Sequence, residues 1–411
     1  MLHVTLIAGT YEPTRCGVAH YTDRLRRALD KLDVKSTVVT THKVANQADG
    51  PDVIGAVHNW SLAELIPLVR SLHATPTDIL HIQHAAGTYG FERAIFLLPL
   101  LLRVTGWRHP IVITVHEYGW WEWQPRWLPS SLLEWLKQWG QQHAWWDRED
   151  GFLLTLSHAM ITTNAEAEAA LHERLPTFHD RIHRLAIAPN IDVVPIDKTV
   201  ARQTVRQLCG WSDDTAVMAF FGFLHPVKGL EILFDAFKQV LAEHPHARLL
   251  LIGGVESLAL VGEQATNYWQ TLHAIVADLE LSKTVHFTGY VSAETASHYL
   301  SGADVGVLPF NHGVTLKSGS LLALLAHALP VVATQANPSD RELDGCLSFV
   351  PPRDGNALVI ALKELLSDRA KREHLSQAGL SLVQRMGWNA IAAAHLQIYR
   401  STLGSSNAAD H

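Results

Sequence analysis

A single lysine lies between two glycines at the end of an apolar run. Residues 220–237 read FFGFLHPVKGLEILFDAF, with Lys228 in a short loop between Gly222 and Gly229. The apolar run before this loop and the amphipathic pattern after it predict a strand, a loop and a helix. Glycines let the backbone approach a ligand closely, and a helix N-terminus carries partial positive charge. With the lysine ammonium, the loop would bind an anion such as a diphosphate. The alternative is a solvated lysine in an ordinary turn.

A second stretch offers similar chemistry. The residues TLKSGSLL (315–322) run into an apolar helical pattern. They bring a cation, hydroxyls and free backbone N–H groups to one predicted helix start, through Thr315, Lys317, Ser318, Gly319 and Ser320. A capped helix start with an exposed lysine is the competing interpretation.

Histidines end two predicted strands in the first half of the chain. His116 follows IVITV (111–115), and His84 ends DILHIQH (78–84). In an open parallel sheet, ligands bind beyond the carboxyl ends of the strands, so both histidines are candidates for a site, although a structural role competes for each. His81 and His84 lie three residues apart on one strand and therefore point to opposite faces. Because no cysteine or carboxylate pattern completes a ligand set, we expect no metal site.

Short apolar segments alternate with helical patterns along the chain, which predicts parallel sheets covered by helices. In the first half the predicted strands are HVTLIAG, KSTVVTTH, DVIGAVH, DILHIQH, IVITVHE and AMITTN. In the second half they are AVMAFFG, ARLLLIGG, TVHFTGY, DVGVLPF and LPVVATQ. Each half is therefore predicted to be a doubly wound α/β domain. The segment 186–199, rich in proline, asparagine and aspartate, is the expected linker.

The composition excludes several classes of protein. The chain has 411 residues, of which 47% are hydrophobic and 18% charged, enough for two domains with sizeable cores. A net charge of −7 argues against binding of nucleic acid. The three cysteines lie far apart, which is typical of a reducing compartment. With no signal peptide and no spanning segment, we expect a cytoplasmic protein.

The order of these motifs resembles a known family. The succession FFGFLHPVKGLEILFDAF, ARLLLIGG, VHFTGYVSAETASHYLSGADVGVLPF and GSLLALLAHALPVVATQ resembles the C-terminal domain of the family-4 retaining glycosyltransferases (glycosyl transferases group 1) of GT-B fold. The first half resembles the acceptor domain of that family through YEPTRCGVAHYTDRLRRAL, DILHIQH, VITVHEYG, ITTNAEAEAAL and IAPNID. The resemblance covers nearly the whole chain and implies two Rossmann-like domains facing across a cleft.

The resemblance also implies roles for residues. Gly17 lies in the loop that faces the donor diphosphate, Lys228 neutralises that diphosphate, and His116 faces the sugar being transferred. The donor-binding candidates are Gly17, Gly222, Phe223, Lys228, Gly254, Tyr290, Val291, Thr315, Lys317, Ser318, Gly319 and Ser320. The acceptor-side candidates are His84, Glu117, Trp120 and Asn164.

Three positions depart from the family pattern. Phe223 stands where the family usually has an arginine, and Thr315 and Ala323 stand where it has a pair of glutamates eight residues apart. We therefore expect Lys317 to replace the missing arginine. These departures keep open the alternative of a degenerate GT-B protein that binds a nucleotide sugar or a partner without turnover.

The segment 119–150 holds eight of the thirteen tryptophans of the chain. Within it, Leu132, Trp135, Leu136 and Trp139 are predicted to form one face of a helix, with Lys137, Gln138 and Gln141 opposite. Three interpretations stay open for this segment: packing on the acceptor domain, a wall of the acceptor pocket, or peripheral membrane contact through residues 119–146 at the inner face of a membrane.

Together with the resemblance, these features predict a hexosyltransferase-like glycosyltransferase that needs no cofactor and no metal. The donor would be a UDP- or GDP-linked sugar, and the acceptor a saccharide, a lipid-linked molecule or a small molecule. Retention of configuration is what the resemblance implies. The expected domains are residues 1–190 with a crossing helix 388–402, residues 191–387, and a disordered tail 403–411.

Overall fold

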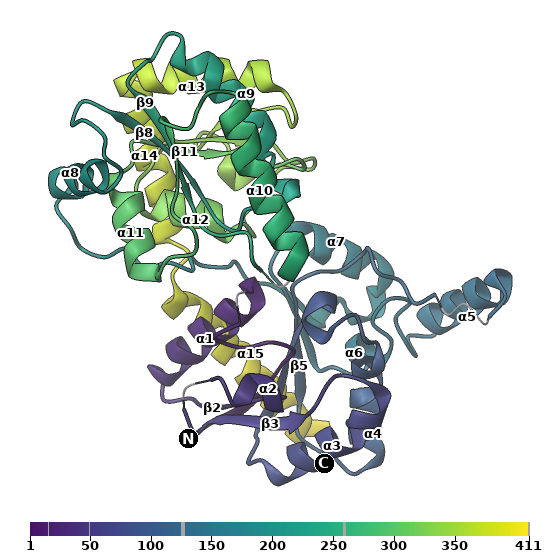
Figure 1. Ribbon diagram of the computed structural model, residues 1–411. Coiled ribbons are helices and arrows are strands. Elements are labelled where there is room, and N and C mark those ends of the chain that lie inside the picture. The colour runs from purple at the N-terminus through teal and green to yellow at the C-terminus, as the bar shows by residue number, and fades with distance from the viewer. Residues whose placement is uncertain (15, 49, 125–127, 258–259, 410–411) are drawn as a thin grey trace. The chain divides into compact units, whose positions relative to one another are not determined.

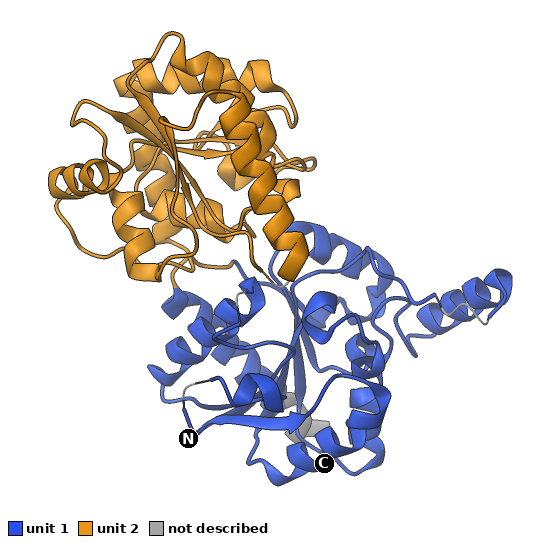
Figure 2. Cartoon of the chain, viewed as in Figure 1, with its two compact units in different colours: residues 1–186, 388–411 blue, residues 187–387 orange. Residues whose placement is uncertain are grey.

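The chain divides into two compact units in a computed structural model that describes residues 1–14, 16–48, 50–124, 128–257 and 260–409 (Figure 1). Unit 1 contains residues 1–186 and 388–411, and unit 2 contains residues 187–387 (Figure 2). Unit 1 is therefore discontinuous in sequence, because its last segment follows the whole of unit 2.

Unit 1 is built on a seven-stranded parallel sheet with the order β3-β2-β1-β4-β5-β6-β7. Its strands are β1 (His3–Ala8), β2 (Lys35–Thr41), β3 (Val53–Val57), β4 (Ile79–His84), β5 (Ile111–Val115), β6 (Ala159–Thr162) and β7 (Ile182–Arg184). The first six match the predicted segments. Strand β7 was not predicted, because its three residues at the sheet edge carry no apolar run.

Helices flank this sheet. They are α1 (Gly17–Asp30), α2 (His42–Ala45), α3 (Leu65–Ala74), α4 (Leu98–Val104), α5 (Ser130–Gln142), α6 (Phe152–Thr155), α7 (Ala165–Arg174) and α15 (Trp388–Ala409), with 3₁₀ turns η1 (Leu62–Glu64), η2 (Ala86–Tyr89), η3 (Ala94–Leu97) and η4 (Pro176–Arg181). Helix α15 packs on α1. It continues to residue 409, although the sequence predicted a disordered tail from residue 403. Residues 403–409 contain no proline that would break the helix, and they end in two alanines, which favour helix. Residues 410–411 of the predicted tail lie outside the described residues.

Unit 2 contains a six-stranded parallel sheet with the order β10-β9-β8-β11-β12-β13. Its strands are β8 (Ala216–Phe221), β9 (Ala247–Ile252), β10 (Val285–Phe287), β11 (Val305–Leu308), β12 (Val331–Thr334) and β13 (Ser348–Val350). The first five match the predicted segments, and the short edge strand β13 was missed. The helices are α8 (Lys198–Leu208), α9 (Leu230–Leu241), α10 (Gly262–Asp278), α11 (Ala293–Gly302), α12 (Gly319–Ala326), α13 (Gly355–Ser367) and α14 (Arg369–Gln384), with turns η5 (Pro226–Lys228) and η6 (Arg341–Leu343).

Both sheets reverse their strand order at one point. In each sheet, the strand that comes first along the chain lies between the strands that come second and fourth. The reversal therefore falls between β1 and β4 in unit 1 and between β8 and β11 in unit 2. In doubly wound folds of this order, the loops beyond the carboxyl ends of these two strands diverge and leave room for a ligand. The candidate residues near Gly222 follow β8, and those near His84 follow β4.

The core of unit 2 explains why α9 forms. Its residues Leu230, Leu233, Phe234, Phe237 and Val240 are completely buried in the main apolar cluster, as their helical spacing predicts. This packing anchors the helix directly behind the lysine loop.

Among the described residues, no helix is both long enough and apolar enough to cross a lipid bilayer.

Candidate functional site

The loops after β8 and β11 are held together in unit 2. The Asn311 backbone N–H donates to the Val227 carbonyl over 3.0 Å, and the Asn311 side-chain amide donates to the Pro226 carbonyl over 3.0 Å. Gly229 lies at φ +67°, and a β-carbon there would overlap the Pro309 carbonyl oxygen. Only glycine combines this backbone conformation with such a close approach. The lysine loop is therefore fixed at the point where the strand order reverses.

Lys228 projects over an aromatic ring in this place. Its Nζ lies 3.6 Å from the centroid of the Phe310 ring, which is a cation–π distance. Removal from water lowers the pKa of the Lys228 ammonium to about 8. In the described part of the chain, no carboxylate lies within ion-pair distance of this nitrogen. A cation that is partly desolvated and carries no counter-ion attracts an anion strongly.

The start of α12 lies beside the same loop. Ser318 caps the helix, because its hydroxyl accepts from the Leu321 N–H over 3.3 Å. The Ser320 side chain packs against Gly222, and Gly319 packs against Asn190. The structure thus brings Gly222, Ser318, Gly319 and Ser320 to one edge of the sheet. Lys317 is exposed just before this helix start, where the Asp340 carboxylate accepts from the Leu316 N–H over 2.6 Å.

The positions that depart from the family pattern have clear surroundings. The Phe223 ring lies nearly parallel to that of Tyr290, with centroids 6.4 Å apart and planes at 16°. Thr315 is half-buried, and its carbonyl accepts from the Ser318 N–H over 2.9 Å. Ala323 is completely buried among apolar residues of unit 2. Aromatic and methyl groups therefore occupy places where the family carries charges.

Two further donor-side candidates line the same edge. Gly254 is buried, and its carbonyl accepts from the Leu224 N–H over 2.9 Å. A β-carbon on Gly254 would approach the Tyr290 backbone nitrogen to 3.2 Å. Val291 is half-buried against the core. Gly254 and Tyr290 are neighbours, as a shared site requires, while Val291 contributes mainly to packing.

In unit 1, His116 lies directly after β5 and is held by a buried glutamine. Its Nε2 lies 2.9 Å from the Gln83 Oε1, and its ring meets the Tyr21 ring edge-on with centroids 4.9 Å apart. Burial, with a smaller effect of the nearby His84 and His395, lowers the pKa of His116 to about 3. The imidazole is therefore neutral at physiological pH.

Gly17, the other candidate in unit 1 for the donor side, is exposed at the first position of α1, with open space around its α-carbon.

His84 is placed differently from the acceptor-side position that the sequence predicted. Its ring is 2% exposed, packs against Tyr89 and Phe96, and its Nε2 lies 3.1 Å from the Asp150 Oδ1. The strand-end position suggested an accessible ring, but the alternation along β4 turns this side chain into the apolar core. His81 points to the opposite face, as predicted.

The other acceptor-side candidates have mixed placements. Glu117 and Trp120 are exposed, and the Trp120 backbone N–H donates to the Glu149 carboxylate over 3.3 Å. Asn164 caps α7, because its side-chain oxygen accepts from the Ala167 N–H over 2.9 Å. The side chain of Asn164 is thus engaged in the helix start.

The tryptophan-rich helix α5 packs with its charged side inward. Leu133, Lys137 and Gly140 are its buried residues, and Trp135 is 57% exposed. The predicted polar side of the helix is therefore partly inside unit 1, while much of the predicted apolar face lies outside. Residues 125–127 of the tryptophan-rich segment lie outside the described residues.

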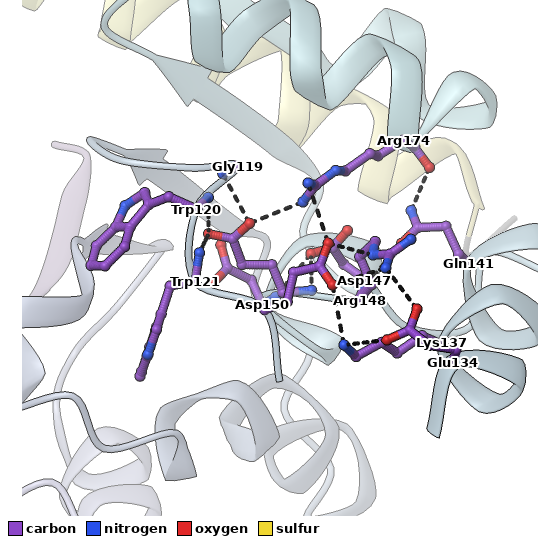
Figure 3. Close-up of polar contacts among 12 residues, drawn as sticks. Gly119, Trp120, Trp121, Glu134, Lys137, Gln141, Asp147, Arg148, Asp150 and Arg174 are labelled. Atoms are coloured by element: carbon purple, nitrogen blue, oxygen red, sulfur yellow. Dashed lines mark hydrogen bonds and ion pairs between the residues drawn. The ribbon is translucent and has the colours of Figure 1, made fainter. Parts of the chain in front are cut away.

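An ion-pair cluster explains this reversed orientation (Figure 3). The Lys137 Nζ lies 3.1 Å from Glu122 and 3.0 Å from Glu134. Arg148 bridges the same two glutamates at 2.7 Å and 3.0 Å. Buried ion pairs of this kind need several partners, and here Lys137 has two.

The cluster continues toward the loop after β5. Arg174 pairs with Glu149 over 2.9 Å, and the Glu149 carboxylate accepts from the backbone N–H groups of Gly119 and Trp121 over 2.9 Å and 3.0 Å. Sequence reasoning missed these residues. The run DRED (147–150) could have indicated this cluster. Four consecutive charged residues beside tryptophans need ion-pair or hydrogen-bond partners where the segment is buried.

Comparisons with known proteins agree with this architecture. Residues 215–368 match the family model described as Glycosyl transferases group 1. A D-inositol 3-phosphate glycosyltransferase of Kineococcus radiotolerans is 28% identical over 53% of this chain and 51% of its own length. A GDP-mannose-dependent monoacylated alpha-(1-6)-phosphatidylinositol monomannoside mannosyltransferase of Corynebacterium glutamicum is 26% identical over 51% of this chain and 52% of its own length.

The chain thus spans about half the length of these curated relatives. Among solved structures, a sucrose-phosphate synthase from Thermosynechococcus elongatus superposes with a TM-score of 0.72 at 20% identity, covering 98% of this chain and 100% of the other. Residues 215–368 of unit 2 thus match the group 1 glycosyltransferases, and the chain with its two doubly wound units has the GT-B fold.

Proposed function

We propose that this protein transfers a sugar from a nucleoside-diphosphate donor to an acceptor, with retention of configuration and without a metal ion. One observation carries this proposal: the loop with Gly222 and Lys228 contacts the start of α12, through Gly222 and Ser320, where the strand order of unit 2 reverses. The alternative, a protein that binds a nucleotide sugar without turnover, is an outcome of the test below.

The reaction breaks the bond between the anomeric carbon and the diphosphate oxygen, and it forms a bond from that carbon to an acceptor hydroxyl oxygen. The hydroxyl proton leaves, and negative charge accumulates on the departing diphosphate. Lys228, Lys317 and the N–H groups at Gly319 and Ser320 are the groups that we assign to this charge. Fixed donors of this kind stabilise developing charge without having to reorganise. We assign to neutral His116 a hydrogen bond to the reacting sugar.

The experiment that tests this function has two stages. Thermal-shift measurements with UDP, GDP and ADP identify the base, because a ligand that binds only the folded protein raises its melting temperature. The purified protein is then incubated with the matching nucleotide sugars and a panel of acceptors, and release of the nucleoside diphosphate is followed. Acceptor-dependent release supports the proposal. Stabilisation by a nucleotide sugar without release under any acceptor identifies the binding module instead.

Lys317 provides a specific prediction about the donor site. The family arginine is replaced by Phe223, whose ring lies against Tyr290, so the diphosphate needs a second cation from elsewhere. We expect Lys317→Ala to weaken binding of the nucleoside diphosphate by about tenfold, the value of one exposed charge contact. Isothermal titration calorimetry measures this change. Unchanged affinity in Lys317→Ala, with weakened affinity in Lys228→Ala, would remove Lys317 from the site.

Exposed apolar side chains of the tryptophan-rich segment 119–150 support a proposal about how an acceptor is reached. Trp120, Trp135 and Trp145 are each more than half exposed, and Leu132 is 44% exposed. Tryptophan favours the interface between lipid headgroups and water. Three cations that the structure describes in this region, Lys137, Arg148 and Arg174, are engaged with glutamates. We therefore propose a contact with lipid that is made by apolar groups; an acylated acceptor also appears in the name of the Corynebacterium relative.

Vesicle sedimentation tests this contact. We expect the wild-type protein to bind phosphatidylcholine vesicles about equally at low and high salt, because the contact is apolar. Trp135→Ala/Trp139→Ala removes on the order of 100 Å² of apolar contact per exposed side chain, which predicts at least about a tenfold loss of partitioning. The control is Leu62→Ala/Ile66→Ala, which deletes exposed apolar groups elsewhere in unit 1. Dimerisation that disappears in the tryptophan variant, without any vesicle binding, would assign the face to a second copy.

A further inference from the structure

A row of buried polar side chains runs from His116 to the C-terminal helix of unit 1. The Gln83 Oε1 lies 2.9 Å from the His116 Nε2, and the Gln83 Nε2 lies 3.1 Å from the His81 Nε2. The His81 Nδ1 lies 2.7 Å from the Tyr399 hydroxyl, and the Thr114 hydroxyl lies 2.8 Å from the His81 Nε2. We call His116, Gln83, His81 and Tyr399 the polar row.

The polar row joins three elements that are distant in sequence. Gln83 and His81 come from β4, His116 follows β5, and Tyr399 comes from α15. Gln83, His81 and Tyr399 are completely buried. A buried polar network costs folding free energy unless its members are hydrogen-bonded, so this row is a feature that an apolar core would not need.

The protonation pattern of the row follows from its chemistry. Burial lowers the pKa of His116 to about 3 and that of His81 well below its ordinary value, so both rings are neutral. A neutral imidazole has one N–H donor and one acceptor nitrogen. Because the Gln83 carbonyl can only accept, the hydrogen of His116 is on Nε2. Because the Gln83 amide can only donate, the His81 Nε2 accepts, and the His81 Nδ1–H donates to Tyr399.

We propose that Gln83 is a positioning residue that fixes His116 in its Nε2–H tautomer, with the lone pair on Nδ1, and that His81 and Tyr399 tie this arrangement to α15. The consequence for catalysis rests on the proposed function, since His116 is assigned there to the reacting sugar. The tautomer itself does not depend on that assignment. The edge-on Tyr21 ring, which also meets the ring of Trp388 in α15, limits rotation of His116 from the other side.

The first test reads the tautomer directly. The ¹⁵N chemical shifts of the His116 ring, assigned by comparison with His116→Gln, should show the Nε2–H tautomer in the wild-type protein. Gln83→Leu should give a mixture of tautomers. Gln83→Glu places a carboxylate beside the ring and should raise the pKa of His116, so that an imidazolium signal appears on acidification at a higher pH than in the wild type. The control is Thr5→Val, which removes a buried hydroxyl from β1 that bonds Thr77 and does not contact the row.

The second test reads catalysis. With an acceptor and donor established, Gln83→Leu should lower kcat by about 10- to 100-fold with little change in KM for the donor, as misplacement of a reacting group does. Tyr399→Phe should act in the same direction by a smaller factor. Gln83→Glu should add a dependence of activity on acidic pH, because the raised pKa of His116 lets this ring take up a proton at a higher pH than in the wild type.

The outcomes separate the two proposals. A His116 signal unchanged in Gln83→Leu, with activity equal to that of Thr5→Val, overturns the positioning role. A tautomer that shifts as expected in a protein without any transferase activity leaves the positioning role intact and removes the proposed function. If Gln83→Leu does not fold, the Gln83→Glu titration alone decides, because absence of a raised His116 pKa contradicts the contact.

Discussion

Replacing Lys228 by alanine should lower the rate of sugar transfer by about 100- to 1000-fold, the effect of removing one preorganised group that stabilises developing charge. The ammonium lies 3.6 Å from the centroid of the Phe310 ring, between loops that hydrogen bonds hold together. The measurement is the initial rate of nucleoside diphosphate release with saturating donor and acceptor.

The pH dependence of donor binding gives an independent test of Lys228. Since desolvation lowers the pKa of this group to about 8, the free protein loses this charge as pH rises above 8. The dissociation constant for the nucleoside diphosphate should therefore increase by up to about tenfold per pH unit above that value. Lys228→Arg should bind without this dependence, because arginine stays charged. Exposed Lys238, on α9, provides the control, and Lys238→Ala should behave as the wild type.

Acidification from pH 7 to pH 5 should destabilise unit 1 through its buried histidines. Burial lowers the pKa of His116 to about 3 and that of His395 to about 4. The unfolded chain takes up protons on these rings below about pH 6.5, whereas the folded chain does not, so the free energy of unfolding falls as pH falls. Each ring should lower the free energy of unfolding at pH 5 by about 2 kcal/mol relative to pH 7. This figure follows from about 1.36 kcal/mol for each pKa unit.

A single variant isolates this contribution. Buried Asp147 acts in the opposite direction, because desolvation raises its pKa to about 6 and its carboxyl group takes up a proton in the folded state. His395→Gln should therefore be compared with the wild type at each pH, and its loss of stability between pH 7 and pH 5 should be about 2 kcal/mol smaller. Urea unfolding followed by tryptophan fluorescence reports on unit 1, which holds most of the tryptophans. Exposed His109→Gln serves as the control, and equal slopes for the two variants would contradict the prediction.

The sequence allowed all strands to be predicted except one edge strand of each sheet, β7 in unit 1 and β13 in unit 2. Apolar runs such as IVITV and ARLLLI are long enough to specify buried parallel strands. Strands β7 and β13 have three residues each, and their pairing depends on a neighbouring strand that is already in place. These two short segments carry no periodic signal of their own.

The candidate site was predictable where a loop geometry has a residue signature. Gly229 and Lys228 are an example, because positive φ selects glycine and a lone loop lysine is visible in the sequence. The inward orientation of Lys137 was not predictable, since it depends on Glu122 and Arg148, which come from outside the helix. His84 was misplaced for a related reason: a strand end alone does not tell which face of the sheet its last side chain joins.

The discontinuity of unit 1 has a consequence for its synthesis. The hydrogen bond between His81 and Tyr399 joins residues 318 positions apart, and every residue of unit 2 is translated between them. Unit 2 is continuous, so it can complete its core while the nascent chain is still attached to the ribosome. The hydrogen bonds of the polar row in unit 1 cannot all form until α15, which carries Tyr399, has left the exit tunnel. A premature stop codon shortly before residue 388 should therefore leave unit 2 able to fold and unit 1 with exposed histidines, a state that chaperones and proteases recognise.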